Sequence, residues 1–269
     1  MARRLTKLAL AVTLAFGFWK GADACVPDPK VTPTFNEQAT PAVREYRDPA
    51  LQLPDTSQGQ EVWRIRLGSW EMSCEGHHTF LEFSKLSPSP APDEIYQIHG
   101  IAMDVKRHDF AQLDFRKASA YSRYMSGDYA LKAFGVNQDH NRKVFGKEPQ
   151  TYTDVFYGTK DEVLRKYMDA LKMADEINRR GDDYRLIEHN SNSVQRSLLE
   201  GLGLKVPALY EGQLILARGM RTWAPGMESG LNLGPQPRGD YEGLSGAELE
   251  KAARSVSGVA KLWTPPPKP

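Results

Sequence analysis

The feature that most constrains the fold is a helix expected over residues 160–180. Thr159-Lys160-Asp161-Glu162 has the form of a capping box, in which the Thr159 hydroxyl accepts from the Glu162 amide and the Glu162 side chain reaches back. Apolar residues then recur at helical spacing, namely Val163, Tyr167, Ala170, Ala174 and Ile177. Arg179, Arg180 and Gly181 are typical of a helix end. A capped amphipathic helix of this length needs an apolar surface to pack against.

Segments of strand length precede this helix and provide that surface. We expect strands over residues 61–70, 78–83, 95–103 and 154–157. Alternation over 95–103 places Gln97 and His99 on one face, and Tyr96 and Ile98 on the other. A second helix is expected over 193–203. The sequence therefore predicts an α+β fold with an antiparallel sheet packed on two helices.

The N-terminus has the three parts of a secretory signal peptide, which we assign to residues 1–24. Arg3, Arg4 and Lys7 precede an uncharged apolar stretch of about twelve residues, and Ala22-Asp23-Ala24 supplies small residues for cleavage. This stretch is too short to cross a hydrocarbon core of roughly 30 Å, and no later stretch approaches a spanning length. We therefore predict a periplasmic or secreted protein without a transmembrane span.

The two cysteines of the chain are Cys25 and Cys74. Cleavage after Ala24 would make Cys25 the first residue of the mature protein, where it could be lipidated or could form a disulfide. Ala22 and Asp23 fit a lipoprotein signal poorly, and two cysteines in an exported chain favour one disulfide between Cys25 and Cys74.

Composition divides the mature chain into three parts and excludes one class of partner. We predict an irregular N-terminal arm (25–60), an α+β domain (61–218) and a Gly/Pro-rich C-terminal extension with a short helix from about Ser245 (219–269). A formal net charge of +1 argues against a nucleic-acid binder, because binding requires a basic excess. No zinc spacing, phosphate-binding loop or dinucleotide fingerprint indicates a metal or cofactor, and nothing indicates an oligomeric state.

Two short clusters could carry chemistry. The first is Cys74-Glu75-Gly76-His77-His78, which leads into a strand, and the second is Asn190-Ser191-Asn192-Ser193, which opens a helix. Their order along the chain resembles the circularly permuted papain-like superfamily, which includes cell-wall peptidases and amidases and the lecithin:retinol acyltransferase group. The matching segments span residues 62–205, and they are His78-Thr79-Phe80, Tyr96 to Gly100, the helix from Thr159 to Gly181, and Tyr184 through Ser193.

This resemblance implies site residues and their roles. It is closest to an uncharacterised bacterial branch with Asn-Ser-Asn-Thr in place of Asn-Cys, and it puts Ser191 at the cysteine position. It implies Ser191 as nucleophile, His78 as base and His99 as the orienting residue, with His77 and Asn190 as alternates. A helix dipole cannot hold a serine hydroxyl ionised, so Ser191 would need a histidine within hydrogen-bond reach. The amides that open the helix would stabilise the oxyanion.

Structural interpretations of the same residues remain open. Asn192 could be an ordinary N-cap, with Gln195 three residues later returning the bond. Alternation allows either His77 or His78 to face the site, His99 could be a hydrogen-bonded core residue, and His189 could replace the base. Cys74 could be the nucleophile only if it is not in a disulfide.

Two functions are consistent with these observations. The first is an exported hydrolase or acyltransferase that acts on amide or ester bonds through a serine nucleophile, and the resemblance suggests peptidoglycan peptides or lipids as substrates. The alternative is a catalytically inactive papain-like domain that binds a peptide, glycan or lipid.

Overall fold

The computed structural model describes residues 44–47, 50–52, 54, 61–73, 76–87, 90–91, 94–104, 109–110, 129–136, 151–185, 189–207, 227, 230–233, 241 and 243–256. All of them belong to one compact unit, Ala42–Pro269. The predicted signal peptide, Cys25 and Cys74 lie outside the described residues.

The described part contains seven strands and three helices. The strands are β1 (Arg44–Arg47), β2 (Trp63–Ser73), β3 (Gly76–Lys85), β4 (Ile95–Asp104), β5 (Asp109–Phe110), β6 (Tyr129–Val136) and β7 (Thr151–Gly158). The helices are α3 (Lys160–Arg180), α4 (Ser191–Gly201) and α5 (Gly246–Val256). The α+β prediction agrees with this architecture.

The strands form one sheet in the order β1-β7-β2-β3-β4-β5, and β6 pairs with β4. All these pairs are antiparallel, as expected, except β1 with β7, which is parallel, so the sheet as a whole is mixed. β1 lies in the arm that we expected to be irregular. Its four residues are too few to show an alternation of apolar and polar residues.

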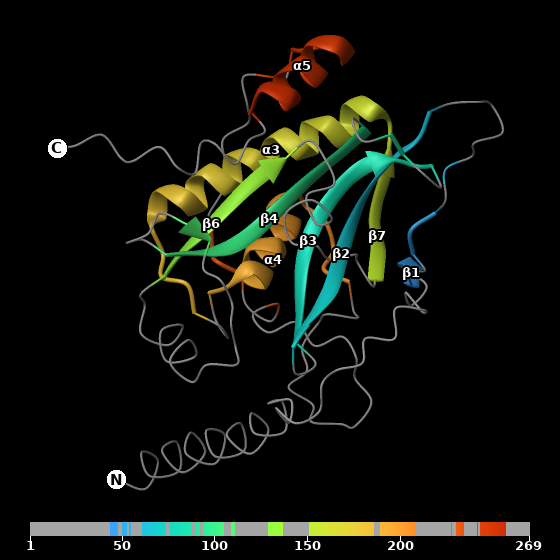
Figure 1. The fold of residues 1–269 in the computed structure, drawn as a ribbon. Coiled ribbons are helices and arrows are strands. Elements are labelled where there is room, and N and C mark those ends of the chain that lie inside the picture. Colours follow the sequence, from blue (N-terminus) through green and yellow to red (C-terminus); the bar gives the residue numbers. More distant parts are fainter. Residues whose placement is uncertain are drawn as a thin grey trace, which may run out of the picture. The chain divides into compact units, whose positions relative to one another are not determined.

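One face of the sheet carries the apolar core. Ile65, Leu67, Leu81, Phe83 and Ile98 on this face pack against α3 and α4. Figure 1 shows α3 running across the sheet between β7 and β6, with α5 beside it. At the β6 end, Asn178 pairs with the backbone of Ala133 through two hydrogen bonds of 2.8 and 2.7 Å.

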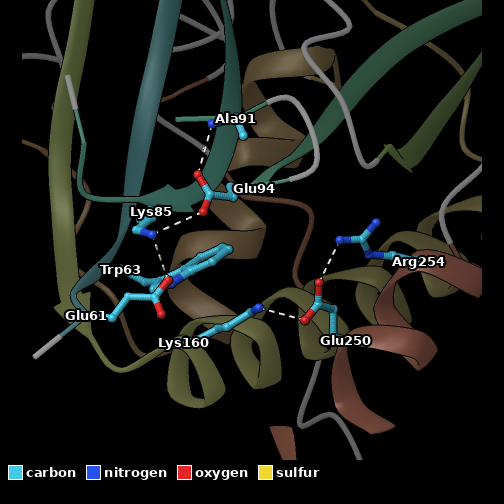
Figure 2. A network of polar contacts seen from close by, with 8 residues as sticks. All are labelled: Glu61, Trp63, Lys85, Ala91, Glu94, Lys160, Glu250 and Arg254. Atoms are coloured by element: carbon cyan, nitrogen blue, oxygen red, sulfur yellow. Dashed lines mark hydrogen bonds and ion pairs between the residues drawn. The ribbon is translucent and has the colours of Figure 1, made fainter. Parts of the chain in front are cut away.

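The start of α3 follows the sequence prediction closely. Thr159 is the N-cap, the Thr159–Glu162 capping box is present, and Gly181 ends the helix in a left-handed conformation. The first helical residue, Lys160, pairs with Glu250 of α5 at 2.6 Å. Figure 2 shows this pair beside a second group in which Lys85 contacts Glu61 and Glu94. All of these ion pairs are partly exposed. The Lys85 pairs join the end of β3 to the residues that precede β2 and β4, and the Lys160 pair joins α3 to α5.

None of the described helices is both long enough and apolar enough to cross a membrane.

Candidate active site

The candidate site lies where β3 and β4 separate. Their pairing ends at Phe80 and His99, and beyond this pair β3 continues along β2 while β4 continues along β6. The N-terminus of α4 lies against this fork. Residues from β3, β4 and α4 that are distant in sequence are thereby brought together.

A buried cap fixes the start of α4. Asn190 is the N-cap, and its Oδ1 accepts from the amides of Asn192 at 2.8 Å and Ser193 at 3.1 Å. The Ser193 hydroxyl accepts from the Asn190 amide at 3.0 Å, which completes a capping box. The helix that we expected over 193–203 therefore begins two residues earlier, and Asn190 is its N-cap, not Asn192. Ser191 is the first residue of the helix.

Asn192 has a different role, because it attaches α4 to β3. Its Oδ1 accepts from both the amide of Thr79 at 2.9 Å and the Thr79 hydroxyl at 2.8 Å. Thr79 lies just past the end of the β3–β4 pairing, so its amide is available to a side chain. This attachment is made one residue after His78, and it therefore sets the position of His78 relative to the helix.

Gly100 allows α4 to approach β4 closely. A Cβ at this position would lie 2.8 Å from the Cα of Ser191 and 3.0 Å from the Cβ of Val194. Such distances are too short for real Cβ contacts, so a side chain here would displace the first turn of α4. The absence of a side chain at Gly100 thus helps to place Ser191.

The central contact joins Ser191 and His78. The Ser191 Oγ lies 2.8 Å from the His78 Nδ1, although the two residues are 113 positions apart in sequence. Both residues are buried, with 5% of Ser191 and 8% of His78 exposed. The structure therefore brings the predicted nucleophile and base within direct hydrogen-bond reach.

Tyr184 forms the other side of the serine environment. Burial raises the pKa of Tyr184 to about 12, and hydrogen bonds with the side chain and the backbone of Ser191 act in the opposite direction. Tyr184 begins one of the segments that carry the resemblance, which assigns it no role. Its hydroxyl is now a candidate participant in the chemistry.

The environment of His78 is apolar. Burial lowers the pKa of His78 to about 3, so the ring is neutral above that pH. The indole of Trp70 lies against it, with ring centroids 4.3 Å apart. A neutral ring can accept a proton at Nδ1 when its own proton is on Nε2.

His99 contacts His78 through ring stacking. The two rings are nearly parallel, at 6° with centroids 6.2 Å apart, and His99 also stacks on Phe80 and Phe134. Its Nε2 lies 3.2 Å from the Gln97 Oε1. His99 thus lies beside His78 in a stacked arrangement, and the orienting role that the resemblance implies for it stays a prediction.

Neither His189 nor Asn190 provides the described contact with the Ser191 Oγ. The side chain of His77 lies outside the described part, and its backbone pairs with Glu71. His189 is half-buried, and its backbone forms a bridge with Arg185. Asn190 is the helix cap. Among the described residues, no group of three or more His, Cys, Asp or Glu could hold a metal ion.

The expected source of oxyanion donors needs correction. The amides of Asn192 and Ser193 donate to Asn190, so they are already engaged. Hydrogen bonds with the side chain and the backbone of Ser191 act on the pKa of Tyr184, so the Tyr184 hydroxyl is a candidate donor beside the serine.

Comparisons of the chain with protein-family models, with curated proteins and with solved structures found no match. The resemblance to the permuted papain-like superfamily therefore remains a prediction.

Proposed function

We propose that this protein is a hydrolase or acyltransferase that cleaves an amide or ester bond with Ser191 as nucleophile and His78 as general base. The observation that carries the proposal is the 2.8 Å contact between the Ser191 Oγ and the His78 Nδ1. The contact is buried, joins two separate elements, and forms at the N-terminus of a helix with no acidic residue in its first turn. The positive end of the helix dipole would therefore favour negative charge that develops at this position.

The first step would form an acyl-enzyme. The Ser191 Oγ attacks the substrate carbonyl carbon while its proton passes to the His78 Nδ1, and the carbonyl π electrons move onto oxygen. When the tetrahedral intermediate collapses, the bond to the leaving amine or alcohol breaks. The leaving group takes the proton from His78, so the ring returns to its neutral form.

The oxyanion would be stabilised by two donors near Ser191. The Tyr184 hydroxyl, which hydrogen-bonds with Ser191, and the Ser191 amide would donate to the substrate oxygen. Burial keeps Tyr184 protonated over the physiological pH range, and only a protonated phenol can donate.

The second step would release the acyl group. Water activated by His78 would give hydrolysis, while an acceptor amine or alcohol in its place would give acyl transfer. The resemblance to permuted papain-like proteins and the predicted export signal support a peptidoglycan peptide or a lipid as substrate, in the periplasm or outside the cell. The predicted Cys25–Cys74 disulfide would leave no free thiol to compete as nucleophile.

Labelling with a fluorophosphonate probe tests this proposal, because the probe reacts with activated serines and requires no knowledge of the substrate. We expect the wild type to be modified on Ser191, and Ser191→Ala and His78→Gln to lose at least about 100-fold in labelling rate. His189→Gln is the matched control, since His189 is the nearest histidine in sequence, and it should label like the wild type. Labelling that survives in His78→Gln would contradict the proposed base.

A thiol at the same position provides an independent measurement. Ser191→Cys should react with iodoacetamide faster than free cysteine does, because the helix dipole and His78 both favour a thiolate. This enhancement should disappear when His78→Gln is added. A slow reaction that does not depend on His78 would exclude the enzymatic function.

Burial of the site favours one alternative, a catalytically inactive domain that binds a peptide, glycan or lipid. A base with a pKa of about 3 resists protonation, which opposes proton transfer from serine. The two functions predict opposite labelling results. An inactive domain should fail to react with the fluorophosphonate and should give Ser191→Cys an unactivated thiol.

A further inference from the structure

The face of the sheet opposite the helices carries a buried row of polar side chains that leads to the site. Register places Arg66 of β2 opposite Glu82 of β3, and Glu82 opposite Gln97 of β4. His99 follows two residues later on the same face of β4, next to His78. All five side chains are buried, so their hydrogen bonds matter more than surface contacts would.

Glu82 is the centre of this row. It is 1% exposed, and Arg66 donates to its Oε1 through Nε at 2.8 Å and Nη2 at 2.7 Å. Its Oε2 accepts from the Gln97 Nε2 at 3.0 Å and from the Tyr152 hydroxyl at 3.1 Å. Burial alone would lower the pKa of Arg66, but the charge and hydrogen bond of Glu82, together with the charges of Tyr152 and Asp154, raise it overall.

These contacts determine the direction of the Gln97 amide. A carboxylate only accepts hydrogen bonds, so Gln97 must turn its nitrogen toward Glu82 and its oxygen toward His99. The amide oxygen in turn only accepts, so the His99 Nε2 must carry a proton. Neutral His99 is therefore held as the Nε2–H tautomer, with its lone pair on Nδ1.

The same contacts hold the ring plane of His99. The hydrogen bond to Gln97 fixes one edge of the ring, while Phe80 and Phe134 stack on it with centroids 5.1 and 5.6 Å away. His99 then lies parallel to His78. Trp70 contacts the His78 ring at 4.3 Å, so that ring is held with its Nδ1 directed at Ser191.

We infer that Glu82 and Gln97 are positioning residues that act through His99. They fix its tautomer and ring plane, and His99 holds the orientation of His78 in which Nδ1 meets the serine. The effect of these residues on the reaction rate of Ser191 rests on the proposed function. The tautomer of His99, in contrast, can be measured without any activity.

Nitrogen NMR of the full chain labelled with 15N-histidine tests the tautomer directly. We expect His99 of the wild type, assigned with His99→Gln, to carry its proton on Nε2. In Gln97→Met the hydrogen bond is lost while the side chain keeps its length. His99 should then show a mixture of tautomers, and fluorophosphonate labelling should fall about 10-fold to 100-fold.

Tyr152→Phe is the matched control. It also removes one hydrogen bond to Glu82, but not the bond between Gln97 and His99. Both the His99 tautomer and the labelling rate should therefore match the wild type.

The outcomes distinguish the inference about Glu82, Gln97 and His99 from the proposed enzymatic function. A wild-type His99 protonated on Nδ1 would overturn the inference even if Ser191 labels normally, and this measurement needs no variant to fold. An unchanged His99 signal in a folded Gln97→Met would overturn it as well. An Nε2–H tautomer that is lost in Gln97→Met, in a protein that the probe does not label, would support the tautomer assignment and contradict the proposed enzyme.

Discussion

The N-termini of α3 and α4 are built from the same local motif in different surroundings. Each begins with a capping box, formed by Thr159 and Glu162 in α3 and by Asn190 and Ser193 in α4. The α3 cap is exposed to solvent, whereas the α4 cap is buried at the fork between β3 and β4. The motif starts a helix equally well in both places.

The first turns show what distinguishes the two helices. In α3 the first turn carries Asp161 and Glu162, whose charges offset the helix dipole, and its first residue forms a partly exposed ion pair with α5 (Figure 2). In α4 the first turn has no acidic residue, and its first residue, Ser191, meets His78. The comparison teaches that the cap itself carries no functional information. An uncompensated dipole and a neighbouring base distinguish a candidate site from a structural helix start.

The largest effect on stability should come from a side chain at Gly100, where α4 lies close to β4. Gly100→Ala would place a Cβ 2.8 Å from the Ser191 Cα, so the first turn of α4 must move. We expect a loss of about 2–3 kcal/mol in the free energy of unfolding, as for other overpacked sites. Fluorophosphonate labelling should fall about 100-fold, because the Oγ is displaced from His78. Urea denaturation and labelling kinetics measure the two effects.

Gly243→Ala is the control for this variant. Apart from its chain neighbours, no described residue lies within 4 Å of a Cβ built at Gly243, so both its stability and its labelling should stay at the wild-type values. Gly100→Ala with normal labelling would show that the close approach does not place the serine.

The pH dependence of stability should report the burial of His78. Its pKa falls from 6.5 to about 3 on folding, so between these values the unfolded chain binds a proton that the folded protein does not. Stability should therefore decrease as the pH falls through this window, by about 2 kcal/mol between pH 7 and pH 5.

Urea denaturation of the wild type and His78→Gln at both pH values isolates this contribution. The difference in free energy of unfolding between the two proteins should change by about 2 kcal/mol between pH 7 and pH 5, because all other titrating groups are the same in both. An equal pH dependence in the two would mean that His78 is not held neutral by the fold. The same low pKa predicts that labelling stays constant down to about pH 4, whereas an exposed histidine would lose it near pH 6.5.

These elements show how far the sequence could predict the fold. The α3 boundaries were correct because its signals are local: a capping box, helical spacing and a terminal glycine. β6 was missed because it lies in a charged, aromatic-rich stretch without clear alternation. The start of α4 was misplaced because Asn190 and Asn192 are both good caps, and only the contact of Asn192 with Thr79 decides between them.

The site was likewise predictable only where its residues belong to short local motifs. Ser191, His78 and His99 came from the order of short motifs, and the structure brings all three together. The contributions of Gly100, Glu82 and Gln97 could not be predicted, because they depend on cross-strand register and on the distance between β4 and α4. Only the assembled sheet determines these two quantities.

Removing the two caps should separate their roles. Thr159→Ala and Asn190→Ala each remove the side chain that accepts the first amides, so each should cost about 1 kcal/mol, and nearer 2 kcal/mol at the buried Asn190. Only Asn190→Ala should lower labelling, because Ser191 directly follows its cap. Thermal unfolding and labelling kinetics check both variants. A similar loss of labelling in Thr159→Ala would mean that general loosening, not the local cap, affects the site.

The smallest effect should follow from changing the first residue of α3. Lys160→Met removes the ion pair with Glu250, whose groups are 33% and 24% exposed, and leaves Glu250 paired with Arg254. We expect a loss of about 0.5 kcal/mol or less in the free energy of unfolding, because partly exposed ion pairs contribute little, and labelling at the wild-type rate. Ser191→Ala at the equivalent position of α4 should show the reverse: a small change in stability with complete loss of labelling. If Lys160→Met lowered labelling, the two helix starts would be coupled, and α4 could no longer be treated as a site separate from the structural role of α3.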